Sequence, residues 1–293
     1  MTATLDVVDP KPAFPEDIER AINDALLNDA RDMCGIMSLV ASRFYAWTKP
    51  LTFRTVIVRR HKNWTKRISD LLLQNASFIR ILAIDLPHAQ ARVSDQELSH
   101  IRALLDASNG VRSLAVSWTI WAHLQRACCS LPLERLYLIW DRTHPTFPPS
   151  LKHMQYPTAL KDLTVYAPPD LRDATPFRPW GELYLPDTAG CVNLECVTYA
   201  ADRTPIPTVG SLCEDIPNLK AAMFVLVDIP GDIASTEDEM VTEDKEVFPT
   251  FSTAYLRFSS QVLGEWLARM EGRCSVLDHP PPRAVDSAEN ENE

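Results

Sequence analysis

The sequence has little glycine, and none of it is arranged to hold a nucleotide. The 293 residues include eight glycines, and none falls in the GxGxxG or GxxxxGK[ST] spacing whose backbone cradles phosphate groups. The chain also lacks an HExxH zinc motif and a GxSxG nucleophile elbow. We therefore expect a protein that is not an enzyme, with no catalytic residues, no cofactor and no metal.

Long apolar runs are missing as well. No stretch of about 18 apolar residues is present, and the first residues, MTATLDVVDPKPAF, carry acids and prolines where a secretory signal needs a basic end. Seven scattered cysteines, an odd number, do not form a secreted disulfide framework. These features predict an intracellular protein, cytoplasmic or nuclear, that does not associate with a membrane.

An excess of positive charge is the third absence. The chain has 29 basic and 39 acidic residues, a net charge of −10, so a broad surface for nucleic acid is not expected. One local basic cluster, RRHKNWTKR at 59–67, surrounds Trp64 and has the composition that holds phosphates and stacks on a base. The same residues fit the polar side of a connecting helix with Trp64 and Leu71 turned inward, and we favour that interpretation.

Two other groups of residues allow a functional and a structural interpretation. Cys191, Cys196 and Cys213 are the nearest approach to a metal site, but cysteine also behaves as a small buried hydrophobic residue. Tryptophans at the ends of predicted strands or in the loops after them have positions that solenoids use for binding. These are Trp118, Trp121 and Trp140, and core packing is the alternative that we favour for each of them.

The N-terminal part of the chain predicts a small helical unit. Pro15 suits a first helical turn, and acidic residues follow it at the positive end of the helix dipole. Apolar residues then recur at helical spacing, at Ile18, Ile22, Ala25 and Leu26. A second apolar helix follows, ended by Pro50, and then an extended segment at Thr55–Val58. The second helix is marked by Ile36, Leu39, Val40, Phe44 and Trp47.

Beyond residue 75 a short strand pattern repeats, with apolar residues at its first, fourth and sixth positions. Several separations fall in the range of leucine-rich repeats, while others do not. The segments are IRILAI at 79, VRSLAV at 111, LERLYL at 133, LKDLTV at 160, WGELYL at 180, LECVTY at 194 and LKAAMF at 219. Similar strands separated by helices predict a parallel sheet in an α/β fold.

Helices are expected between several of these strands and after the last one. Ser94 and Glu97 have capping-box spacing at the start of a helix that stops near Gly110, and TIWAHLQRACCS precedes Leu133. A final helix, predicted from about Tyr255 to Gly272, is expected to cover the last repeat and protect its sheet edge.

The N-terminal residues resemble an F-box. FPEDI corresponds to the Leu-Pro-x-Glu-Ile helix start of that family, and SLVASRFYAWTKPLTFRTVIV to its second, tryptophan-containing part. With the leucine-rich-like strands behind it, the chain is similar to fungal families of F-box-like proteins. The expected organisation is a disordered segment (1–13), an F-box-like domain (14–58), a leucine-rich-repeat-like solenoid (59–275) and a disordered tail (276–293).

This resemblance implies a substrate-recognition adaptor of a Skp-cullin-F-box ubiquitin ligase. The helical unit would bind the Skp-type adaptor and thereby the cullin core, while the repeats would bind an unknown protein target. The implied adaptor-binding residues are Phe14, Pro15, Ile18, Ile22, Leu39, Val40 and Trp47. The main alternative is a leucine-rich-like interaction scaffold whose F-box segment serves only as its N-terminal cap.

Overall fold

The computed structural model describes residues 14–29, 34–59, 66–85, 94–139, 151–167, 190–202, 216, 218–227, 252–256 and 260–273. The expected repeat strand at 180–185, Trp140, Cys213 and most of the basic cluster at 59–67 lie outside them. Also outside are both predicted tails. Within the described part, no helix combines the length and the apolar character needed to cross a bilayer.

Over the described ranges, eight parallel strands form one sheet, and their spatial order is their order along the chain. The predicted α/β fold with a parallel sheet is therefore confirmed. The strands are β1 (Thr55–Arg59), β2 (Ile81–Asp85), β3 (Ser113–Ser117), β4 (Arg135–Ile139), β5 (Asp162–Ala167), β6 (Cys196–Asp202), β7 (Ala221–Val227) and β8 (Ser252–Leu256).

The repeated sequence pattern corresponds to one structural position in each unit. Its first apolar residue lies two positions before a strand and is buried under the helices, as at Ile79, Val111 and Leu133. The next residue begins the inter-strand ladder, because its backbone N–H donates to the carbonyl of the corresponding residue of the preceding unit at 2.7–2.9 Å. We call these residues the amino-edge row: Arg54, Arg80, Arg112, Glu134, Lys161, Glu195 and Lys220.

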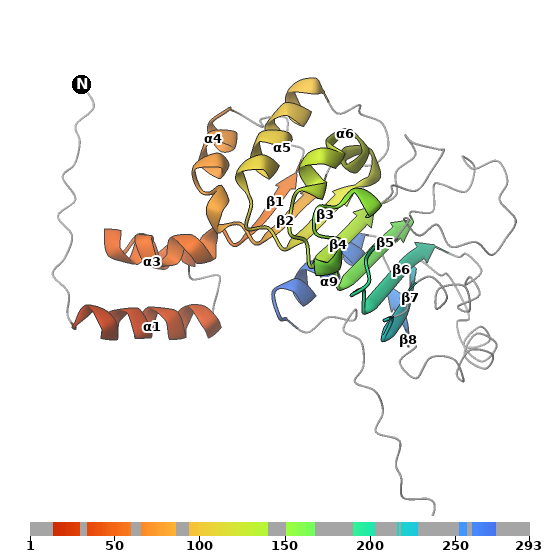
Figure 1. The fold of residues 1–293 in the computed structure, drawn as a ribbon. Coiled ribbons are helices and arrows are strands. Elements are labelled where there is room, and N and C mark those ends of the chain that lie inside the picture. The colour runs from red at the N-terminus through yellow and green to blue at the C-terminus, as the bar shows by residue number, and fades with distance from the viewer. Residues whose placement is uncertain are drawn as a thin grey trace, which may run out of the picture.

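The two faces of the sheet carry separate cores because side chains alternate along each strand. On β4, Leu136 and Leu138 point to one core, while Tyr137 and Ile139 point to the other. Helices α4 (Lys66–Gln74), α5 (Asp95–Ala107) and α6 (Trp118–Cys129) cover the first face, and α9 (Ser260–Met270) covers the second (Figure 1). The predicted capping box at the start of α5 is present.

The position of α9 differs from the expectation. It lies against the middle of the second face, where Trp266 contacts Tyr137 of β4 at 5.6 Å between ring centroids, rather than over the last unit. Arg269 of α9 forms an ion pair with Asp162 at the start of β5. The aromatic and apolar face of α9 buries more surface on the broad middle of a sheet than on the end of it.

The helical prediction that began near Tyr255 was also wrong at its start. Residues 252–256 form β8, paired in parallel with β7, and α9 begins only at Ser260. The predicted stop is confirmed, since Gly272 has a positive φ of 72° after the helix.

The N-terminal helices lie outside both cores. Helix α1 (Glu16–Asp29) runs beside α3 (Ser42–Thr52), away from the sheet (Figure 1). Both core clusters contain only residues from Val56 onward. Helix α3 meets the rest of the chain at the 3-10 helix η2 (Ala76–Phe78), where the Lys49 ammonium lies 5.6 Å from the Phe78 ring centroid.

The predicted second helix is divided in two. Residues Cys34–Met37 form α2, a turn follows at 38–40, and Ala41 is extended before α3. Pro50 lies within the last turn of α3, which continues to Thr52, so the helix ends two residues later than expected. The turn places Leu39 and Val40 outside any helix, where both are exposed.

Candidate functional site

The helical unit presents an apolar surface to solvent. Among the described residues, eight of the twelve exposed large apolar side chains lie between residues 14 and 51. They are Phe14, Ile18, Ile22, Ile36, Leu39, Val40, Tyr45 and Leu51, which we call the N-terminal apolar surface. Contiguous exposed apolar patches mark interaction sites, and the excess of exposed apolar residues in one small unit makes this unit the candidate.

The residues expected to bind an adaptor have high exposure within this unit. Leu39 is 85% exposed, Phe14 55% and Val40 51%, while Ile18 and Ile22 are 45% and 46% exposed. These values are far above those of the sheet cores, where side chains such as Leu82 and Leu136 have no exposed surface. The five side chains are therefore accessible to a partner.

The other two expected residues have different surroundings. Pro15 is exposed, and its carbonyl accepts hydrogen bonds from the N–H groups of Ile18 (3.0 Å) and Glu19 (3.1 Å), which opens α1. Trp47 is half-buried and packs edge-on against Phe44, with 5.2 Å between ring centroids. Trp47 thus contributes to the internal packing of α3.

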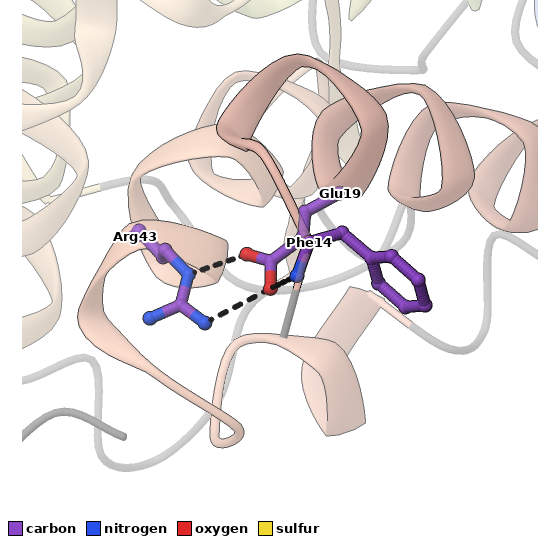
Figure 2. A network of polar contacts seen from close by, with 3 residues as sticks. All are labelled: Phe14, Glu19 and Arg43. Atoms are coloured by element: carbon purple, nitrogen blue, oxygen red, sulfur yellow. Dashed lines mark hydrogen bonds and ion pairs between the residues drawn. The ribbon is translucent and has the colours of Figure 1, made fainter. Parts of the chain in front are cut away.

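An ion pair inside the unit fixes the start of α1 beside α3. The Arg43 guanidinium donates from Nε to Glu19 Oε2 at 2.8 Å and from Nη2 to Oε1 at 3.4 Å. The same carboxylate accepts a hydrogen bond from the Phe14 backbone N–H at 3.5 Å (Figure 2). Because the Glu19 side chain is only 7% exposed, this contact is screened less than a surface pair.

The Glu19–Arg43 pair was not foreseen from the sequence. Acidic residues in a first helical turn are already explained by the helix dipole, and nothing in the spacing of 24 residues indicates a partner. Ile36 and Tyr45 were likewise absent from the expected site, although both are exposed apolar residues of the same unit.

Asn23 of α1 is another polar residue inside the helical unit. It is fully buried, and within the described part of the chain neither its amide nitrogen nor its oxygen has a hydrogen-bond partner. Such a group costs about 1–3 kcal/mol. The helical unit therefore contains a buried amide that lowers its stability.

The remaining candidates are placed in the core. Trp118 and Trp121 are buried in α6, so the core interpretation holds for both. Cys191 is buried and Cys196 is half-buried, and the described residues include no group of three or more side chains able to hold a metal ion. Burial raises the pKa of Cys129 to about 11, so this thiol remains protonated at neutral pH.

A second unusual feature is a group of polar atoms beneath α9. Within the described residues, the hydroxyls of Thr164 and Thr198, paired across β5 and β6, have no hydrogen-bond partner. The same is true of Trp266 Nε1 and Asp162 Oδ1. Burial raises the pKa of the Asp162 carboxyl, an effect that the neighbouring Arg269 opposes.

Comparisons with known proteins add no relative to this description. No protein-family model matches the chain, and no significant match is found among curated proteins or solved structures.

Proposed function

We propose that this protein is a substrate-recognition adaptor of a Skp-cullin-F-box type ubiquitin ligase. The N-terminal helical unit binds the Skp-type adaptor, and the sheet domain, a leucine-rich-repeat-like solenoid, binds a protein target. The observation that carries the proposal is the N-terminal apolar surface, which lies on the segment that resembles an F-box.

The burial pattern supports a partner rather than an internal role for this surface. Leu39, Val40 and Phe14 each leave about half or more of their surface in water. Covering a fully exposed side chain of this size contributes about 1.5–3 kcal/mol. A helical unit with several such residues is suited to helix-face docking by a second protein.

The architecture supports the repeat component of the proposal. Each strand pairs with the strand that follows it in the chain, and most described units repeat the same buried apolar position before the strand. A sheet built by this stepwise addition offers an extended surface. Because α9 covers the middle of the second face, the target surface would lie at the sheet edges or on the helical face.

The test is direct binding of a purified Skp-type adaptor, followed by calorimetry. The wild-type protein should bind, and the double variant Ile18→Asp, Leu39→Asp should lose at least tenfold in affinity with its melting temperature kept within about 2 °C. The matched control is Leu71→Asp, Val192→Asp, since both residues are exposed apolar residues outside the helical unit. The expectation that Leu71 turns inward is wrong, because its side chain on α4 is 46% exposed. The control variant should bind like the wild type.

Two results would overturn the proposal. One is failure of the folded wild-type protein to bind the adaptor. The other is a large fall in melting temperature for the Ile18→Asp, Leu39→Asp variant with no partner affected, which is the behaviour of an N-terminal cap on a scaffold.

A further inference from the structure

The amino-edge row contains two halves with different charge patterns. Its last four members alternate in sign: Glu134, Lys161, Glu195 and Lys220. Within this half, Lys220 Nζ lies 3.0 Å from Glu195 Oε1. The alternating half thus neutralises its own charge.

The first three members, by contrast, are all arginines. Arg54, Arg80 and Arg112 are exposed and directly precede β1, β2 and β3, and each is linked to the next by a backbone hydrogen bond of 2.9 Å. We call them the arginine triplet. Adjacent parallel strands are about 4.8 Å apart, so the backbones of the three arginines lie within roughly 10 Å of one another. Like charges at this spacing repel one another.

The triplet is only slightly neutralised by the rest of the described chain. Arg112 Nε lies 3.8 Å from Glu134 Oε1, in a pair whose two side chains are 48% and 43% exposed. An exposed pair at this separation contributes little. Within the described residues, Arg54 and Arg80 have no ion-pair partner within 4.0 Å.

Two of the guanidinium groups are held in place by backbone carbonyls. Arg80 Nη1 donates to the carbonyls of Ser77 (2.9 Å) and Ile79 (3.1 Å), and Arg112 Nη1 donates to that of Pro132 (3.2 Å). Arginine has five N–H donors, so those on Nε and Nη2 of Arg80 have no acceptor among the described residues. A positioned guanidinium with free donors matches a carboxylate.

Gly110 makes room for one of these groups. A Cβ at this position would clash with Nη1 of Arg80, so the guanidinium lies over the glycine. The absence of a side chain at residue 110 therefore contributes to the position of Arg80.

We propose that the arginine triplet binds an acidic segment of a partner protein through its Asp and Glu carboxylates. The site is short, and Glu134 ends it on one side. The chain as a whole carries a net charge of −10. A few clustered carboxylates fit such a site, whereas a nucleic acid carries charge continuously along its length and would be repelled beyond the triplet. This proposal is independent of Skp binding.

The experiment uses the full-length protein and a fluorescein-labelled (Asp-Glu)5 decapeptide, with (Asn-Gln)5 as the neutral control. Fluorescence anisotropy at 50 and 200 mM NaCl should show binding of the acidic peptide only, weaker at the higher salt. Arg80→Glu, Arg112→Glu should reduce the affinity at least tenfold. Gly110→Ala should reduce it about threefold, because it displaces the Arg80 guanidinium without changing the charge.

The matched control is Arg102→Glu, Arg126→Glu, which makes the same charge change at exposed positions of α5 and α6. It should retain binding within about twofold. The proposal is overturned if the wild type does not prefer the acidic peptide, or if the control loses as much affinity as the triplet variant. It is also overturned if a ten-nucleotide single strand binds more tightly and that binding depends on Arg80 and Arg112.

Discussion

The helical unit and the sheet domain use apolar residues in opposite ways. In the sheet domain the apolar pattern is a packing pattern, and residues such as Leu114 and Leu138 have none of their surface exposed. In the helical unit Leu39 has the same side chain and is 85% exposed. Similar apolar spacing in a sequence therefore does not distinguish a residue that completes its own core from one that is available to another protein.

The largest expected effect comes from one substitution made in both regions. Leu138→Ala should reduce the free energy of unfolding by about 2–5 kcal/mol, because it leaves a cavity in a packed core. Leu39→Ala should change it by less than about 0.5 kcal/mol, since the side chain has few neighbours to lose. Urea denaturation followed by circular dichroism measures both. Equal losses would show that Leu39 belongs to a core and that the apolar surface is not free.

Two arginine–carboxylate pairs with a buried carboxylate, one in each region, offer the next comparison. Arg269→Met leaves the Asp162 carboxyl buried without its partner, which should lower the global unfolding free energy by about 3 kcal/mol. Arg43→Met does the same to Glu19, but that pair joins only α1 and α3. Hydrogen exchange should therefore accelerate in α1 and remain unchanged in β3 and β4. If the sheet amides of the Arg43 variant also accelerate, the two regions unfold as one unit.

A smaller effect is expected at the buried amide of the helical unit. Asn23→Leu removes a buried amide without hydrogen-bond partners and keeps a similar volume, so it should stabilise α1 by about 1 kcal/mol. Hydrogen exchange of the α1 amides should slow about fivefold. Arg20→Leu, at an exposed position of the same helix, is the control and should leave exchange unchanged. Faster exchange in the Asn23 variant would mean that the amide has a structural role.

The smallest expected effect is a change of stability with pH, and it comes from a buried residue of the sheet domain. The pKa of Asp162 is raised above its usual 3.8 by burial, so the folded protein holds this proton more tightly than the unfolded chain does. Stability contributed by this group is therefore present below pH 3.8 and is lost as pH rises through the raised pKa. The wild type should lose stability relative to Asp162→Asn as the pH rises above 3.8. If the wild type instead gains stability relative to Asp162→Asn as the pH rises, the pKa of Asp162 is lowered, not raised, in the folded protein.

Much of the sheet could be predicted because its strands repeat one local pattern. The apolar residue two positions before a strand and the alternating strand side chains predicted β2 to β7, and the Ser94–Glu97 pair predicted the start of α5. The strand β8 was missed because Tyr255 fits a helical pattern and only pairing with β7 selects the extended form. Such pairing is a tertiary effect that local propensity does not contain.

The residues of the candidate site could be named from the sequence, but their exposure to solvent could not be predicted. Phe14, Ile18 and Leu39 were expected at the site because of the resemblance to an F-box, yet spacing alone does not show whether an apolar face is covered. The location of α9 could not be predicted for the same reason, since its amphipathic pattern does not specify which surface the helix covers. The amino-edge row also required the register of the strands before its charges could be aligned.

The return of α9 to the middle of the sheet has a consequence for synthesis. Strands added in chain order can each pair with a completed neighbour as they leave the ribosome, so the first face and its helices can form early. The second face, with Tyr137 and Ile139, stays open until residues 260–270 emerge. During most of its translation, the nascent chain therefore exposes an apolar face of the sheet to water. Chaperone binding in that interval should depend on this face.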